Sequence, residues 1–167
     1  MKLRKLDGRD AVFMLEWMHD PSVTRYLQNN FMERTRRDCE QFIEDSRKDR
    51  NNLHMAVVDD NDIYMGTVSL KHMTCGTGEF AIALRSCAMG KGFSKFGMSE
   101  MLRIGLEDLH LEYIYWCVNP LNKRAVRFYD KNGYERINVD EISNQQLKGF
   151  YSKEQIATFL WYRKGVS

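Results

Sequence analysis

The sequence predicts a mixed α/β (α+β) fold in a single domain that spans residues 1–167. The 167 residues are 43% hydrophobic and 29% charged, which is enough chain to bury one core. Short apolar runs typical of strands alternate along the chain with longer amphipathic stretches typical of helices. Only two prolines occur and no segment repeats, so neither a linker nor a repeat array is indicated.

The N-terminal part of the chain predicts one strand and two helices. The strand is MKLRKL (residues 1–6), and the first helix is RDAVFMLEWMHD (residues 9–20). A second helix is predicted over residues 35–50, where Thr35 is a suitable N-cap. Positions at i, i+3, i+4 and i+7 form the buried face of this helix: Cys39, Phe42, Ile43 and Ser46. The opposite face of the helix is charged and is expected to be solvated.

Three strands are predicted next, over residues 53–59, 64–73 and 79–86. The polar turn DDND joins the first two, which indicates an antiparallel hairpin. From Ser94 onward the period becomes that of a helix. The positions that share one face of this helix are Met98, Met101, Leu102, Gly105, Leu106 and Leu109.

The C-terminal part returns to strands around one more helix. YIYWCV (residues 113–118) is a near-continuous apolar run typical of an interior strand. The helix NKRAVRFYDKN (residues 122–132) follows, with Gly133 as its C-terminal stop. A strand after this helix and a last one over residues 158–163 complete the order. Together the elements predict a mixed, mostly antiparallel twisted sheet of about seven strands flanked by helices.

Composition and charge argue against several classes of protein. The chain has 25 basic and 23 acidic residues and no dense basic block, so no nucleic-acid partner is expected. Apolar runs are too short for a membrane span or a signal peptide, so a cytoplasmic protein without a membrane partner is expected. The four cysteines form no CxxC pair, and no histidine lies near them at zinc-ligand spacing. We therefore expect neither a metal nor a disulfide.

The stretch AMGKGFSKFGMSEML (residues 88–102) places two glycines around Lys91 just before a helix. Such a bare backbone exposes N–H groups at the positive end of the helix dipole, which favours phosphate oxygens. The dinucleotide pattern GxGxxG would require glycine where Lys95 stands, and the Walker A pattern would require lysine where Met98 stands. By itself the loop is either a phosphate site of another kind or a tight turn between a strand and a helix.

Residues 89–94, MGKGFS, resemble the pyrophosphate loop Arg/Gln-x-x-Gly-x-Gly/Ala of the GNAT superfamily of N-acetyltransferases. Met89 replaces the Arg/Gln, and Ser94 replaces the last small residue. Two other segments resemble the RimJ/RimL-type branch of that superfamily. AVFMLEWMHDPSVTRYL (residues 11–27) resembles its L-x-W-x-x-D-P-x-V opening, and VNPLNKRAVRFYDKNGYERI (residues 118–137) resembles V-x-P-x-N followed by A-x-x-x-Y-x-K-x-G-F/Y. The resemblance covers about residues 1–138.

The resemblance implies that acetyl-CoA binds as cosubstrate in a V-shaped split between two central parallel strands, here residues 79–85 and 113–118. The pantetheine arm is expected to pair with the main chain of the first strand and to accept a hydrogen bond from Asn122, and the pyrophosphate to lie on the glycine loop. The implied cofactor-binding residues are Ile82, Ala83, Leu84, Met89, Gly90, Lys91, Gly92, Phe93, Ser94, Lys95 and Asn122.

Two residues are candidates for proton transfer. Asn122 and Tyr129 are almost two helical turns apart, so both are expected on one side of the helix. The resemblance implies that Tyr129 protonates the departing thiolate as general acid, whereas the helix alone favours an aromatic packed beside Ala125 and Val126. Glu79 is the candidate general base; the alternative is a strand-end carboxylate paired with a neighbouring base or hydroxyl.

The acceptor pocket is expected around the first two helices, where Trp17, Asp20, Tyr26 and Phe31 are the candidate substrate-binding residues. With Glu33 in the same region, two acids and several aromatics suit a cationic amine. The predicted function is acetyl transfer by direct attack of a primary amine, on a small molecule such as an amino sugar or polyamine or on a peptide N-terminus. One alternative is a module that binds acyl-CoA without turnover. Another is a Rossmann-like nucleotide binder, which the glycine pattern of this chain disfavours. The resemblance also implies a homodimer.

Overall fold

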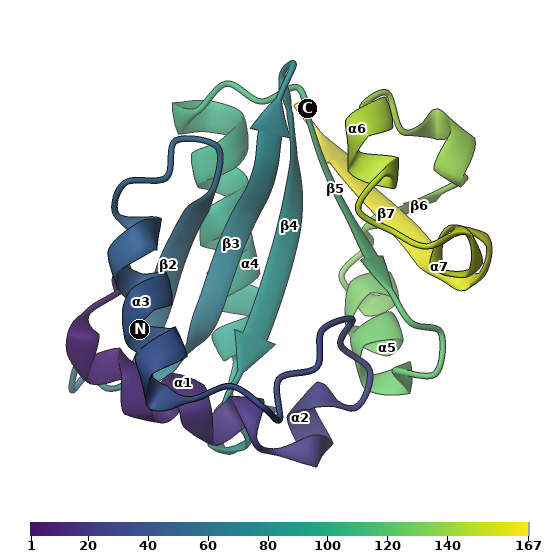
Figure 1. The fold of residues 1–167 in the computed structure, drawn as a ribbon. Coiled ribbons are helices and arrows are strands. Elements are labelled where there is room, and N and C mark those ends of the chain that lie inside the picture. Colours follow the sequence, from purple (N-terminus) through teal and green to yellow (C-terminus); the bar gives the residue numbers. More distant parts are fainter. Residues whose placement is uncertain (167) are drawn as a thin grey trace.

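Seven strands form one continuous sheet in the computed structural model, which describes residues 1–166 (Figure 1). Their spatial order is β1-β2-β3-β4-β5-β7-β6, and every neighbouring pair is antiparallel except β4 with β5. The predicted mixed, mostly antiparallel sheet of about seven strands is confirmed. The strands are β1 (Lys2–Lys5), β2 (Leu53–Val58), β3 (Tyr64–Thr74), β4 (Thr77–Leu84), β5 (Tyr113–Val118), β6 (Glu135–Ile137) and β7 (Leu160–Gly165).

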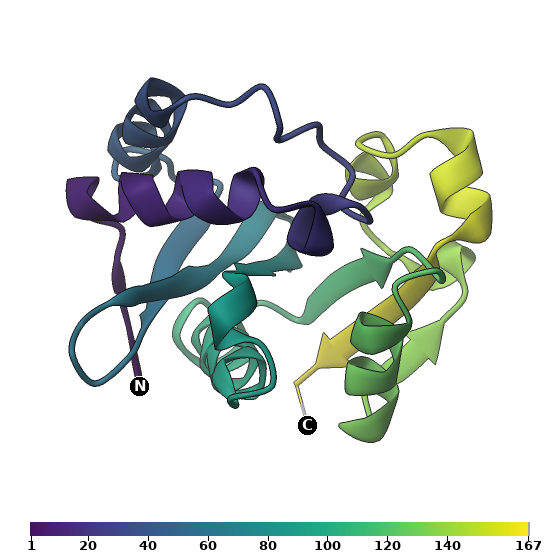
Figure 2. The same ribbon diagram turned by 90° about the horizontal axis from the view of Figure 1, so that it is seen from below.

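Helices cover both faces of the sheet. Figure 2 shows α1, α2 and α3 on one face, with α6 and α7 on the same side, and α4 and α5 on the other. Within residues 1–166 no helix has the length and apolarity that crossing a membrane requires. The helices are α1 (Ala11–Met18), α2 (Pro21–Thr24), α3 (Arg36–Ser46), α4 (Phe93–Arg103), α5 (Lys123–Lys131), α6 (Gln145–Lys148) and α7 (Lys153–Thr158).

Helix α3 begins where the sequence predicts and ends earlier. Thr35 is its N-cap: the Thr35 hydroxyl accepts from the Asp38 N–H at 3.2 Å, and the Asp38 carboxylate accepts from the Thr35 N–H at 2.7 Å. The helix stops at Ser46 rather than at residue 50. The Asp49 carboxylate accepts from the N–H groups of Asn51 and Asn52 at 2.8 and 3.0 Å, and this turn competes with further helix.

Helix α4 continues into a wider π-helical turn over Ile104–Asp108, within the span predicted as regular helix. The turn brings Gly105 against the sheet, where a Cβ would lie 2.6 Å from Ile114 Cδ1 and 2.9 Å from Leu70 Cδ1. Gly133 follows α5 with φ 72°, and its N–H donates to the Asp130 carbonyl at 3.0 Å. Gly133 therefore ends α5 as predicted.

The sequence did not predict α2, α6 or α7, because helices of one or two turns are too short to show a period. The segment with α6 and α7 packs Ile142, Leu147 and Tyr151 against Tyr115 of β5 and Trp161 of β7. These apolar contacts hold the C-terminal segment on the same face of the sheet as α1, α2 and α3.

Candidate active site

The two parallel strands at the centre of the sheet pair over only three residues. The pairs are Thr77 with Tyr113, Gly78 with Ile114, and Glu79 with Tyr115. Beyond them β4 runs on to Leu84 and β5 to Val118, and the two strands diverge (Figure 1). The predicted central parallel pair is therefore splayed, and the β4 main chain beyond Glu79 has no strand partner on its β5 side within the described residues.

Side chains on the two diverging strands alternate between the faces of the sheet. Phe80, Leu84, Trp116 and Val118 belong to the large core cluster that includes α4 and Tyr129 of α5. Tyr115 and Cys117 pack instead in the cluster of the C-terminal segment, on the opposite face. We call these faces the α4/α5 face and the α1/α7 face.

The glycine loop has the bare backbone that its sequence indicates. Gly90 and Gly92 have φ values of 76° and 88°, in the left-handed region that favours glycine. Gly92 is the N-cap of α4, and the first intrahelical bond runs from the Phe96 N–H to the Gly92 carbonyl at 3.0 Å. The N–H groups of residues 93–95 therefore lack intrahelical acceptors. Amides at a helix N-terminus, with exposed Lys91 and Lys95 beside them, fit a pyrophosphate.

Several predicted cofactor-binding residues bury their side chains at least in part. Met89 and Ala83 pack against the cluster beneath α1 and α3, whereas Ile82 packs against the cluster of the α4/α5 face. Phe93 is buried in that second cluster. Met89 is therefore an anchor of the loop, so the loss of the polar Arg/Gln side chain leaves the donors of the loop in place.

Asn122 lies at the N-cap of α5, so it precedes the helix rather than sharing a helical face with Tyr129. Its Oδ1 accepts from the Ala125 N–H at 3.2 Å, which leaves the Nδ2 donors for a ligand. Asn122 follows the end of β5 by four residues and therefore lies at the open end of the split.

Tyr129 is buried among aromatic rings on the α4/α5 face. Its ring centroid lies 5.7 Å from that of Trp116 and 5.1 Å from that of Tyr162. Its hydroxyl has no hydrogen-bond partner among residues 1–166, and the Trp116 Nε1 beside it is a buried donor without an acceptor in the same range. Burial raises the pKa of the Tyr129 hydroxyl. The hydroxyl therefore keeps its proton at neutral pH, as a general acid must.

Glu79 lies where the parallel pairing ends, on the opposite face from Tyr129. It is 4% exposed and accepts hydrogen bonds from the Tyr151 hydroxyl and from His72 Nδ1, the latter at 2.9 Å. Lys71 Nζ lies 3.4 Å from its Oε1. Burial by itself would raise the pKa of the Glu79 carboxyl, but the His72 hydrogen bond, the Lys71 charge and the Tyr151 hydrogen bond outweigh it and lower the pKa. Glu79 is therefore an ionised carboxylate with both oxygens engaged.

The four candidate substrate-binding residues do not form one surface. Trp17 is 4% exposed, donates from Nε1 to the Tyr64 hydroxyl at 3.0 Å, and supports the ring of Phe31 edge-on at 5.1 Å. Asp20 is the N-cap of α2 and accepts from the Ser22 N–H at 2.9 Å. Tyr26 lines an open pocket, whereas Phe31 is half-buried against the cluster beneath α1 and α3.

The pocket that Tyr26 lines has a volume of about 430 Å³ and joins the α2 side to the C-terminal helices. Asn119 and Leu121, one and three residues after β5, line it on the side of the open end of the split, and Glu154 and Phe159 line it from α7 and the residue after it. Sequence reasoning missed His72, Tyr151 and Glu154, because no local motif marks them.

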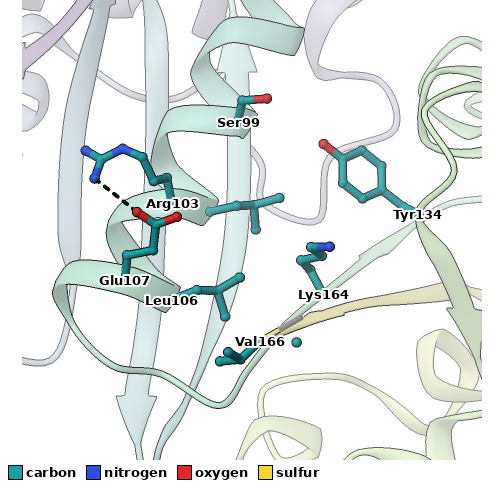
Figure 3. A pocket seen from close by; sticks show the side chains of 9 residues that line it. Ser99, Arg103, Leu106, Glu107, Tyr134, Lys164 and Val166 are labelled. Atoms are coloured by element: carbon teal, nitrogen blue, oxygen red, sulfur yellow. Dashed lines mark ion pairs between the residues drawn. The ribbon is translucent and has the colours of Figure 1, made fainter.

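A second pocket, of about 410 Å³, lies on the α4/α5 face at the paired end of the parallel strands (Figure 3). Ser99 and Leu106 of the α4 region border one side, Tyr134 enters from the other, and Lys164 lies between them. Tyr134 also packs on Tyr129, with ring centroids 6.3 Å apart, so this pocket adjoins the Tyr129 side of the candidate active site.

Comparisons with known proteins identify the class. The family model described as the acetyltransferase (GNAT) domain matches residues 1–135. An uncharacterized N-acetyltransferase of Bacillus licheniformis, p20, is 26% identical over 141 residues, which are 81% of this chain and 79% of that protein. The acetyltransferase PseH of Campylobacter jejuni is 19% identical over 140 residues, 82% of this chain and 84% of that protein.

Solved structures agree on the fold. A chimera of spermidine N-acetyltransferase SpeG from Vibrio cholerae and hSSAT has a TM-score of 0.76 at 20% identity, over 98% of this chain and 94% of that chain. The Vibrio cholerae spermidine N-acetyltransferase in complex with CoA and spermine has a TM-score of 0.74 at 22% identity, over 81% of each chain. The split sheet and these matches define the chain as an acetyltransferase. More narrowly, it belongs to the GNAT acetyltransferase family.

Proposed function

We propose that this protein acetylates a primary amine by direct attack on acetyl-CoA, as a member of the RimJ/RimL-type branch. The observation that carries the proposal is the parallel pair that opens after Glu79 and Tyr115. It leaves a strand edge free for the amides of a pantetheine arm and connects the two faces of the sheet. A donor and an acceptor that enter from opposite faces meet in such an opening.

The α4/α5 face supplies the cofactor contacts in this proposal. Acetyl-CoA, when bound, supplies the acetyl group as an activated thioester. The free edge of residues 82–84 pairs with the pantetheine amides, Asn122 Nδ2 donates to the same arm, and the N–H groups of residues 93–95 hold the pyrophosphate. Lys91 and Lys95 add positive charge that suits phosphate oxygens.

Tyr129 acts as the general acid in this proposal. Its buried hydroxyl is protonated at neutral pH and is not committed to a partner in residues 1–166, so it is free to give its proton to a thiolate. Direct attack is favoured over an acyl-enzyme because burial raises the pKa of the Cys117 thiol, which faces the α1/α7 face, to about 12. A thiol with that pKa supplies almost no thiolate nucleophile at neutral pH.

We propose that the acceptor enters from the α1/α7 face past Tyr26 and Phe31. The class of acceptor is a small molecule with a primary amine, such as an amino sugar or a polyamine, or a peptide N-terminus. The fold similarity to a spermidine N-acetyltransferase supports testing polyamines first. A cytoplasmic location and a homodimer stay predictions, which fractionation and light scattering test.

The experiment that tests the proposed function measures release of the CoA thiol from acetyl-CoA against a panel of amines. The panel holds polyamines, amino sugars and their nucleotide conjugates, aminoglycosides and short peptides. Turnover with one class supports the proposal and names the substrate. Binding of acetyl-CoA by calorimetry without turnover on any amine would favour the acyl-CoA-binding module instead.

A further inference from the structure

His72 reaches the active-site face because β3 carries a bulge there. Lys71 pairs with Glu79 and Thr74 pairs with Thr77, so two residues of β3, 72 and 73, lie opposite the single Gly78. Met73 lies against Gly78 and packs on the α4/α5 face. His72 is thus the extra residue, and its φ of 52° turns its side chain back toward Glu79.

The Glu79 carboxylate determines which nitrogen of His72 carries the proton. Because Glu79 is ionised and can only accept, the His72 Nδ1 at 2.9 Å must donate. With the hydrogen bond made through Nδ1, the second ring nitrogen, Nε2, has no hydrogen-bond partner among residues 1–166. The His72 side chain is 25% exposed, whereas that of Glu79 is 5% exposed. His72 is therefore the accessible end of this pair.

Groups from three elements surround the pair and hold it in one arrangement. Lys71 of β3 lies 3.4 Å from the Glu79 Oε1, and Tyr151, between α6 and α7, donates to that same oxygen. Phe150 stacks on the His72 ring with centroids 3.6 Å apart and planes 9° apart. On β5, Cys117 adjoins Tyr151. Stacking and hydrogen bonding together restrict the rotation of the imidazole.

We propose that His72 Nε2 accepts the proton of the acceptor's ammonium group, directly or through one water, and that Glu79 is the positioning residue that orients His72. This assignment rests on the proposed function. It explains why Glu79 lies at the last parallel pair with neither oxygen available: its partner His72, and not Glu79 itself, is the exposed member of the pair. The arrangement is a carboxylate, a histidine and a reacting proton in series.

The proton balance of the step closes without a further reactant. His72 takes one proton from the ammonium and releases it to solvent at its exposed edge. The amine nitrogen then bonds to the acetyl carbon as the carbon–sulfur bond breaks, and the sulfur takes a proton from Tyr129. The second proton of the nitrogen restores the Tyr129 hydroxyl. The products are the amide, the CoA thiol and one released proton.

The central test is chemical rescue of His72→Ala by imidazole, measured with the acceptor that turns over in the amine panel. We expect kcat to fall at least about a hundredfold, which is the lower end for such groups. Added imidazole should then raise the kcat of the variant at least about fivefold above its value without imidazole. His54→Ala is the matched control. His54 lies on the neighbouring strand β2 with its Nδ1 on Ser69 at 2.7 Å, and its variant should retain activity and ignore imidazole.

Two further variants separate the pair. Glu79→Gln should lower kcat without any response to imidazole, whereas a direct role for Glu79 as base would leave His72→Ala nearly as active as wild type. His72→Gln keeps a polar side chain without a basic nitrogen; thermal melting checks its folding, and its kcat should fall as far as that of His72→Ala.

The outcomes distinguish the two proposals. Wild-type turnover, together with unchanged acetyl-CoA binding by His72→Ala, supports the proposed function. If His72→Ala is then fully active, or if imidazole does not rescue it, only the role of His72 is overturned. A folded wild type without turnover on any amine overturns both.

Discussion

The two sides of the split are built from different parts of the polypeptide. On the α4/α5 face, the loop around Gly90 and Gly92 offers main-chain N–H groups, and the free edge of β4 offers more. On the α1/α7 face, His72, Glu79 and Tyr151 offer side chains that hydrogen-bond to one another. A main-chain site depends on backbone conformation and tolerates side-chain change, as Met89 illustrates. A side-chain network depends on each group it contains.

The largest effect is expected from a change of backbone on the first side. Gly92→Val should weaken acetyl-CoA binding at least about a hundredfold, because left-handed strain of about 1–3 kcal/mol adds to the side chain that obstructs the loop. Calorimetry with acetyl-CoA measures this. Met89→Arg is the control in the same loop and should change the dissociation constant no more than about threefold. Tight binding by Gly92→Val would refute the loop assignment.

A side-chain change on the α4/α5 face should separate binding from turnover. Tyr129→Phe keeps the aromatic packing with Trp116 and removes only the hydroxyl. Acetyl-CoA binding should stay within about twofold, while kcat falls at least about tenfold, as expected when a general acid is lost. Steady-state kinetics beside calorimetry measure both. An unchanged kcat would remove Tyr129 from the mechanism.

The last prediction concerns stability rather than binding or turnover and rests on His54, which hydrogen-bonds to Ser69 rather than to a carboxylate. Burial lowers the pKa of His54 to about 4. The unfolded chain binds a proton near pH 6.5 and the folded chain does not, so stability should fall as the pH drops from about 6.5 to about 4. After a discount for the partial exposure of His54, we expect a loss of roughly 1–3 kcal/mol.

Urea unfolding at several pH values measures this dependence. His54→Gln should flatten it over that interval, whereas His110→Asn, which alters an exposed histidine and keeps a residue that tolerates its φ of 55°, should not. An equally steep dependence in His54→Gln would show that other groups cause the loss of stability.

Much of the fold and of the cofactor side could be predicted because the signals are local. Thr35 caps α3 through a residue three positions away, and Gly133 ends α5 through its own φ value. The glycines of the loop lie within three residues of each other. In each case the physical cause and the residue that shows it lie within one turn of chain.

The acceptor side could not be predicted in the same way. Glu79 was a candidate base, with a paired strand-end carboxylate as the alternative, and its pairing with His72 and Tyr151 agrees with that alternative. Tyr151 lies 72 positions from Glu79 in a segment whose short helices show no period. Trp17 was a candidate for substrate binding, yet its indole is buried against Tyr64.

The sequence by itself determined the order of the strands and of the longer helices, the glycine loop and the identity of the aromatic helix residue Tyr129, because these depend on periods and turns that neighbouring residues set. Only the tertiary structure decided where the parallel strands part, that a bulge turns His72 toward Glu79, and that Tyr151 closes the network from the C-terminal segment. The physical reason is that such contacts join distant residues, and packing rather than local preference brings them together.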